Sequence, residues 1–162
     1  MNSLKKILII GSGQAAIYAA SEIRKHDKDS LVTIFGNENY HPYERPPLSK
    51  EYLIDKKKED EFLFFSKNFF DDQNINFIKK EINSVNFKNR YLISFDNEKY
   101  FYDKLLITTG STNRKIEIDK EIDNEIYYLR NLDDANKIKK KASEVNNIAI
   151  IGGGFIGLEI AS

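Results

Sequence analysis

The apolar positions near the amino terminus predict a βαβ unit. Residues 7–10 form a continuous apolar run, which is typical of a parallel strand buried on both faces. A Gly-rich turn follows, and residues 31–35 form a second apolar run. The stretch between them, residues 14–25, predicts a helix whose apolar face is made by Ala15, Ala16, Ala19, Ala20 and Ile23. Strand, tight turn, helix and strand within about thirty residues is the pattern of a right-handed βαβ crossover.

The middle of the chain predicts mixed structure. Residues 39–51 contain all three prolines and predict an ordered loop, because proline restricts the backbone. Residues 62–72 predict a short amphipathic helix, and residues 75–82 predict a strand. Short alternating runs with polar turns between them then predict an antiparallel meander at residues 84–88, 91–95 and 99–102.

The last third of the chain repeats the pattern of its beginning. Residues 105–110 again have the pattern of a buried parallel strand and end at a glycine. The connector that follows predicts a strand at 126–129 and a helix at 133–145. Residues 148–151 are a second continuous apolar run before a second Gly-rich turn. Because one strand and two helical turns cannot bury their apolar faces alone, we expect this second unit to be cut short.

Composition narrows the function further. The chain has 162 residues, of which 41% are hydrophobic and 31% charged, as in a globular protein. Its 25 basic and 25 acidic residues give no net charge, so a nucleic-acid partner is not expected. The absence of cysteine excludes disulfides, cysteine metal sites and a redox-active dithiol within these residues, and we predict no metal site. No apolar stretch approaches the roughly 18 residues that span a membrane, so we expect a soluble cytoplasmic protein.

Both glycine turns carry dinucleotide-binding spacing. The first glycine of such a turn permits a tight bend, the second lets the backbone approach a pyrophosphate, and the third small residue packs the helix on the strand. The residues at these positions are Gly11, Gly13 and Ala16 in the first turn, and Gly152, Gly154 and Gly157 in the second. Glycine turns also cap helices without binding phosphate, but two copies that each follow a buried strand favour dinucleotide binding.

The end of the second strand holds the candidates for binding the adenosine ribose. An acid is expected there, and Glu38 is the nearest one, slightly beyond the usual place. Asn37 could hydrogen-bond a ribose hydroxyl without a charge. The alternative is that Glu38 is an ordinary acid of a surface loop.

Five segments, taken together, resemble one enzyme family. They are Gly11–Ala15, Tyr43–Lys50 with its Arg-Pro-Pro-Leu-Ser-Lys sequence, Thr109–Gly110 with Arg114, Leu129–Ala135, and Gly152–Glu159. In this order they resemble the FAD-dependent NAD(P)H:ferredoxin and rubredoxin reductases of the putidaredoxin reductase type, within the pyridine nucleotide–disulfide oxidoreductase superfamily. The resemblance covers essentially the whole chain.

The resemblance implies an α/β fold with a Rossmann-like FAD-binding domain, built from a parallel sheet with helices and an antiparallel meander. Residues 1–112 would form this domain, residues 113–146 a connector, and residues 147–162 the truncated start of a Rossmann-like NAD(P)-binding domain. It further implies hydride transfer from NAD(P)H to FAD, and electron transfer to a small iron–sulfur protein of the ferredoxin or rubredoxin type. This fragment alone is then expected to be inactive.

Roles for individual residues follow from the same resemblance. Lys50 on the FAD loop and Glu159 on the first NAD-domain helix would meet beside the flavin. A cation near the flavin and an anion near the nicotinamide both favour hydride transfer, because the flavin becomes negative and the nicotinamide positive. The further residues that would bind FAD are Ala15, Asn37, Arg45, Ile82, Thr109, Gly110 and Arg130.

Three alternatives stay open at the level of sequence. An FAD subunit of the NADH-linked nitrite reductase type shares both glycine turns, although the segment ending at Lys50 argues against it. A flavoprotein resembling apoptosis-inducing factor would have a binding role that outweighs turnover. A truncated, non-catalytic FAD-binding module is the third.

Overall fold

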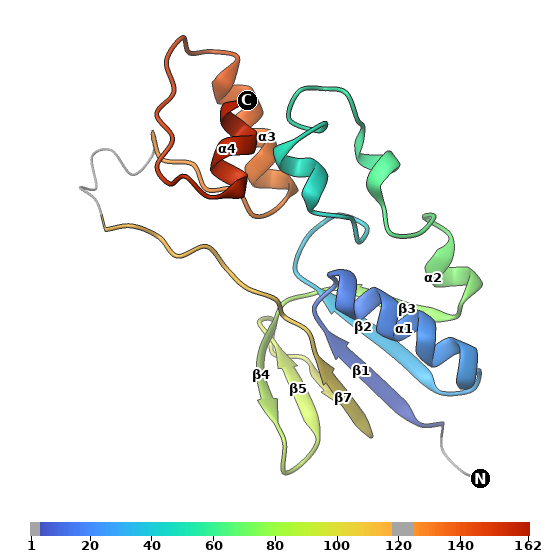
Figure 1. Ribbon diagram of the computed structural model, residues 1–162. Helices are drawn as coiled ribbons and strands as arrows, with labels where there is room; N and C mark the ends of the chain where they lie inside the picture. Colours follow the sequence, from blue (N-terminus) through green and yellow to red (C-terminus); the bar gives the residue numbers. More distant parts are fainter. Residues whose placement is uncertain (1–3, 118–124) are drawn as a thin grey trace. The chain divides into compact units, whose positions relative to one another are not determined.

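The computed structural model describes residues 4–117 and 125–162 (Figure 1). The chain divides into two compact units. One unit consists of Met1–Tyr43 and Leu63–Gly110, and the other of Glu44–Phe62 and Ser111–Ser162. We call them the sheet unit and the helical unit and describe each by itself.

The sheet unit is built on four parallel strands in the order β3-β2-β1-β7. They are β1 (Lys6–Ile10), β2 (Leu31–Gly36), β3 (Ile75–Lys79) and β7 (Lys104–Ile107). Helix α1 (Gln14–His26) connects β1 to its neighbour β2, so the predicted βαβ unit is confirmed. Strand β1 pairs with β2 on one side and with β7 on the other, which places the first glycine turn at the centre of the sheet.

Side chains of β1 and β2 bury both faces of this sheet in alternation. Ile9 and Ile34 belong to a cluster with residues of α1 and α2 (Phe69–Asp72), whereas Ile10 and Phe35 belong to a second cluster with residues of the meander. Ile9 and Ile34 are fully buried. The continuous apolar run at residues 7–10 is therefore explained by a strand with packing partners on both faces.

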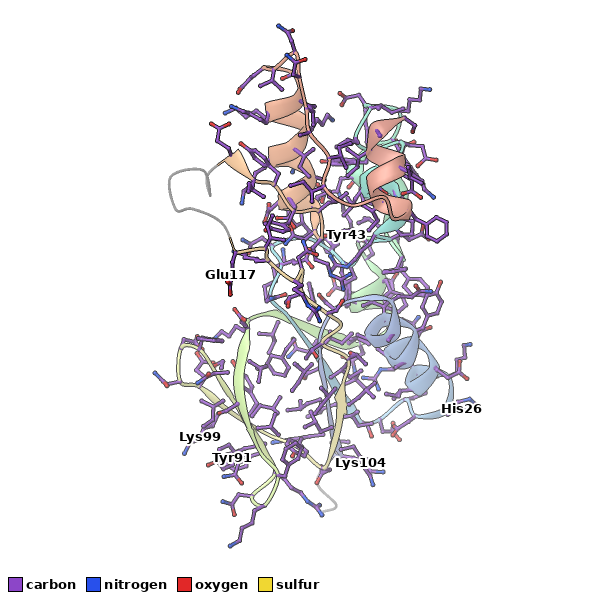
Figure 2. The ribbon with its side chains drawn as sticks, turned by 60° about the vertical axis from the view of Figure 1, so that its left-hand side comes forward. His26, Tyr43, Tyr91, Lys99, Lys104 and Glu117 are labelled. Atoms are coloured by element: carbon purple, nitrogen blue, oxygen red, sulfur yellow. The ribbon has the colours of Figure 1, made fainter. Side chains whose placement is uncertain are left out.

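The meander consists of β4 (Ile82–Asn86), β5 (Tyr91–Ser94) and β6 (Lys99–Phe101), which pair antiparallel in that order, as predicted. Its outer side is polar and aromatic: Figure 2 shows Tyr91 and Lys99 together, and the Lys99 Nζ lies 5.1 Å from the centre of the Tyr91 ring. Lys80, just before β4, pairs with Asp96 at 2.6 Å and Glu98 at 2.7 Å. Hydrogen bonds to these two carboxylates raise the pKa of Lys80.

Two sequence predictions in this unit are wrong. Residues 62–72 do not form one helix: Phe62 ends a 3₁₀ helix, and the α-helix covers only Phe69–Asp72. Leu63 instead makes an antiparallel bridge with Tyr43, and the Phe64 N–H donates to the Pro42 carbonyl at 3.1 Å, so the backbone there is extended. The predicted strand at 75–82 is divided between β3 and β4, which belong to different sheets.

The helical unit contains two short 3₁₀ helices and two α-helices. They are η1 (Pro46–Ser49), η2 (Glu59–Phe62), α3 (Leu132–Ala142) and α4 (Phe155–Ala161). The η1 segment contacts both α3 and α4. Residues 126–129 and 148–151 form no strand here, against the sequence prediction, because neither stretch has a neighbouring strand among the described residues with which to pair. The predicted helix at 133–145 ends at Ala142.

Candidate functional site

The first glycine turn is held in a shape that only glycine adopts readily. Gly11 has a φ of 103°. A Cβ at this position would lie 2.2 Å from the Thr108 carbonyl oxygen. Thr108 in turn donates to the Ile10 carbonyl through its N–H at 2.8 Å and its hydroxyl at 2.9 Å. The end of β7 therefore packs directly against the turn and fixes it.

The next glycine leaves open space in front of α1. Gly13 is the N-cap of this helix and makes no side-chain cap hydrogen bond, and the first helical turn contains no acidic residue. A Cβ at Gly13 would meet nothing within 4 Å. No Gly13 side chain therefore occupies the N–H groups of the first helical turn. Together with the helix dipole, these groups suit a phosphate group. A pyrophosphate fits this position.

The helix behind the turn buries a slightly different face from the one predicted. Ala16, Ile17 and Ala20 are buried, and Ala16 is fully so. Ala15, which the sequence placed on the apolar face, is exposed. The small third residue of the motif thus packs the helix on the sheet, whereas Ala15 lies on the open side of the first helical turn.

Gly36, at the end of β2, is a site residue that sequence reasoning missed. A Cβ there would lie 2.5 Å from the Ser12 hydroxyl oxygen and 2.8 Å from the Ser12 Cβ. Gly36 is therefore required for the close approach of the glycine turn to β2. A glycine that ends the second apolar run was the signal available in the sequence.

The ribose candidates lie just after this glycine. Asn37 is exposed, and the half-buried carboxylate of Glu38 accepts a hydrogen bond from the Tyr43 hydroxyl. Of the other predicted FAD residues in this unit, Ile82 is the first residue of β4, while Thr109 and Gly110 follow β7 and are exposed. The role of each in binding FAD stays a prediction.

In the helical unit, two predicted residues flank η1: Arg45 is its N-cap and Lys50 its C-cap. Pro46 and Pro47 restrict the backbone, and the Leu48 side chain is 2% exposed. The Lys50 N–H donates to the Pro47 carbonyl at 3.0 Å. The position of Lys50 is therefore fixed by a buried anchor and by local hydrogen bonds.

Lys50 and Glu159 meet, as the resemblance implied. The Lys50 Nζ lies 3.5 Å from Oε1 of Glu159, on α4, and both side chains are partly exposed. The other oxygen of the carboxylate, Oε2, accepts a hydrogen bond of 2.5 Å from the Ser49 hydroxyl. Sequence reasoning missed Ser49, although it is the polar residue next to Lys50 in the motif.

A second pair of predicted residues is joined through the backbone. The Arg45 Nη1 donates to the Arg130 carbonyl at 2.6 Å. On the other side of Arg130, its N–H donates to the Asp134 carboxylate at 2.9 Å, within the capping box that Asn131 and Asp134 form at the start of α3. The helix cap and Arg45 thus fix the backbone that carries Arg130.

The second glycine turn has the local shape of the first. Gly152 has a φ of 108°, and Gly154 is the N-cap of α4. A Cβ at Gly157 would lie 2.2 Å from the Gly152 carbonyl oxygen, so the third glycine is required for the approach of the helix to the turn. No residue of α4 is buried.

Among residues 4–117 and 125–162, no cluster of three or more His, Cys, Asp or Glu side chains could bind a metal ion. Over the same residues, every helix is too short or too polar to cross a membrane.

Known proteins that resemble this chain in sequence or structure include ferredoxin and rubredoxin reductases. The chain is 36% identical to the ferredoxin–NAD(+) reductase component of a 3-phenylpropionate/cinnamic acid dioxygenase from Photorhabdus laumondii, over 96% of this chain and 39% of that protein. The structure resembles a ferredoxin reductase from Rhodopseudomonas palustris (TM-score 0.91, 30% identity, 97% of this chain and 39% of the other). It also resembles the NADH:rubredoxin oxidoreductase of Clostridium acetobutylicum (TM-score 0.86, 34% identity, 98% and 41%).

The chain thus spans about two fifths of the length of the relatives that it matches. The family model for pyridine nucleotide-disulphide oxidoreductases matches residues 5–162, which include both glycine turns, the Lys50–Glu159 pair and the Arg45–Arg130 contact. The chain therefore belongs to the pyridine nucleotide-disulphide oxidoreductase family.

Proposed function

We propose that this chain supplies the amino-terminal, FAD-binding part of an NAD(P)H oxidoreductase that passes electrons to a small iron–sulfur protein of the ferredoxin or rubredoxin type. The observation that carries the proposal is the first glycine turn. Gly11 is held at positive φ against Thr108, and the space in front of Gly13 is open. The named relatives, which include a ferredoxin–NAD(+) reductase component and an NADH:rubredoxin oxidoreductase, supply the substrate classes.

Each part of the sheet unit has a role in this proposal. The first-turn N–H groups of α1 bind the FAD pyrophosphate, and Gly13 lets it approach the backbone. Asn37 and Glu38, at the end of β2, bind the ribose. Ile82, Thr109 and Gly110 line the same cofactor through backbone groups. When bound, FAD accepts a hydride and releases electrons singly, which is the chemistry that a nicotinamide donor and a one-electron iron–sulfur acceptor require.

The helical unit supplies charged groups for the reacting end of the cofactors. Lys50 stabilises negative charge that develops on the flavin, and Glu159 stabilises positive charge that develops on the nicotinamide. Arg45 and Arg130 add donors for FAD. Gly152, Gly154 and Gly157 begin the NAD(P)-binding domain, of which residues 147–162 are the first part, after an FAD domain at 1–112 and a connector at 113–146.

The cysteine content of these residues does not fit the disulfide reductases of the family. The chain contains no cysteine, so the stretch around Lys50 cannot carry the dithiol of the disulfide reductases. For the electrons that leave the flavin we propose an iron–sulfur acceptor. We propose the cytoplasm as the compartment, because a soluble nicotinamide nucleotide is the proposed electron donor.

The test is an assay of the full-length gene product. We expect purified protein to bind one FAD, to be reduced anaerobically by NADH or NADPH, and to reduce a ferredoxin or a rubredoxin in turnover. Comparison of the two nucleotides and the two acceptors at equal concentrations identifies the preferred pair. A protein that binds FAD but reduces neither acceptor would favour a binding role, and a protein that binds no FAD would contradict the proposal.

A further inference from the structure

Ser49 is a buried polar residue for which the proposed function has no role. It is 7% exposed and lies at the end of η1, directly before Lys50. Its hydroxyl oxygen lies 2.5 Å from Glu159 Oε2 and 3.4 Å from the Pro46 carbonyl oxygen. A serine hydroxyl has a single proton to donate, and the shorter contact, to a carboxylate, is the stronger one. Ser49 therefore donates to Glu159.

The two oxygens of Glu159 have different partners as a result. Oε2 accepts from Ser49, whereas Oε1 faces the Lys50 ammonium at 3.5 Å. The Lys50 side chain is long and 47% exposed, so its ion pair alone restricts the carboxylate little. Ser49 has one short side-chain torsion, and its backbone follows two prolines and the buried Leu48. It is thus the more rigid of the two partners.

Apolar packing does little to fix Glu159. No residue of α4 is buried, and Phe155 and Leu158 are 88% and 61% exposed. The contacts between η1 and α4 are therefore an important restraint on the orientation of the Glu159 side chain.

We propose that Ser49 is a positioning residue for hydride transfer. By donating to Oε2, it holds the Glu159 carboxylate so that Oε1 is directed at Lys50 and stays in one orientation when a nicotinamide binds. This inference rests on the proposed function, in which Glu159 acts at the nicotinamide. Misplacement of a reacting or charge-stabilising group by about 1 Å can slow a reaction strongly, so the loss of one hydrogen bond that fixes such a group has a measurable cost.

The test uses the full-length FAD-bound protein and a double-mutant cycle. We expect Ser49→Ala to bind FAD as the parent does but to be reduced by NADH or NADPH on the order of tenfold more slowly in single turnover. In a Glu159→Ala background, which removes the acceptor, Ser49→Ala should have little further effect, because its action passes through the carboxylate. The matched control is Ser143→Ala, which removes a hydroxyl that donates only to the Lys140 carbonyl in the same unit.

Crystal structures supply a readout that is independent of activity. In Ser49→Ala we expect the Glu159 carboxylate to rotate and the Lys50 Nζ to Glu159 Oε1 distance to exceed 4 Å. An unmoved carboxylate, or an equal loss of rate in the Glu159→Ala background, would overturn the inference. If Ser49→Ala does not fold, Ser49→Cys, with a weak donor of similar size, goes through the same measurements. A parent protein that binds no FAD contradicts the proposed function instead, whatever the position of Glu159.

Discussion

The two glycine turns have nearly the same backbone in very different surroundings. Gly11 and Gly152 have φ angles of 103° and 108°. The helix caps Gly13 and Gly154 have φ angles of −80° and −77°, both with extended ψ. Around the first turn, β1 lies between two strands and α1 buries four residues, whereas residues 148–151 form no strand and α4 buries none.

The comparison separates what the motif determines from what the neighbours determine. Glycine spacing sets the bend and the start of the helix in both copies, because these depend on backbone geometry within a few residues. Burial and strand pairing depend on residues distant in sequence: Phe35 and Thr108 hydrogen-bond to the first turn and its strand. Four predictions test this separation, from the largest expected effect to the smallest.

The strongest contrast is between Gly11→Ala and Gly152→Ala. Both substitutions place a side chain at positive φ, but only at Gly11 would the Cβ collide with a neighbour, the Thr108 carbonyl. We expect Gly11→Ala to lower the free energy of unfolding by about 3 kcal/mol or more, and Gly152→Ala by about 1 kcal/mol. Urea denaturation followed by circular dichroism measures both. Equal losses would show that the surroundings of the first turn add nothing.

A buried arginine anchors the first helix, and α4 has no counterpart. Arg24 is 2% exposed and donates to the backbone carbonyls of Gln73, Asp27 and Asn74. Arg24→Met leaves these acceptors without their donor, at a cost of about 2–3 kcal/mol in urea denaturation. Lys25→Met, at the exposed neighbouring position, is the control and should change stability by less than about 1 kcal/mol. A similar effect of both would contradict the anchoring role.

The third motif position differs between the two turns. Ala16 is fully buried in the first, whereas a Cβ at Gly157 would lie 2.2 Å from the Gly152 carbonyl oxygen. Ala16→Gly removes a buried methyl group and lowers helix propensity, so we expect a loss of about 1–2 kcal/mol with the fold retained. Thermal unfolding measures this loss. Unchanged stability would mean that Ala16 contributes nothing to the packing of α1.

The smallest effect concerns the meander that covers the sheet beside the first turn. Hydrogen bonds to Lys80 lower the pKa values of Asp96 and Glu98 below their ordinary 3.8 and 4.5. A carboxyl with a lowered folded-state pKa stabilises the fold above its ordinary pKa and loses this contribution as pH falls through the lowered value. With Lys80→Met, the free energy of unfolding should therefore fall slightly less steeply as the pH decreases. Parallel curves for parent and variant would contradict the role of these exposed pairs.

Sequence reasoning succeeded where local pattern and local structure coincide. The βαβ unit, the meander and the starts of α1 and α4 follow from periodicity and glycine spacing. The meeting of Lys50 and Glu159 came from the family resemblance, because nothing in their local sequence relates η1 to α4. Residues 62–72 have helical periodicity, but the Tyr43–Leu63 bridge keeps part of that segment extended. Gly36 and Ser49 were missed because their importance arises from contacts with Ser12 and Glu159 that only the folded chain reveals.

The central claim is that the open space at Gly13 receives the FAD pyrophosphate. Gly13→Ala tests it most directly, because the added Cβ meets no protein atom within 4 Å and should leave the fold unchanged. Gly153→Ala, where a Cβ also meets nothing, is the matched control. In the full-length protein, absorbance of bound flavin should show that Gly13→Ala loses most of its FAD while Gly153→Ala keeps it. A folded Gly13→Ala variant that binds FAD as tightly as the parent would contradict the account.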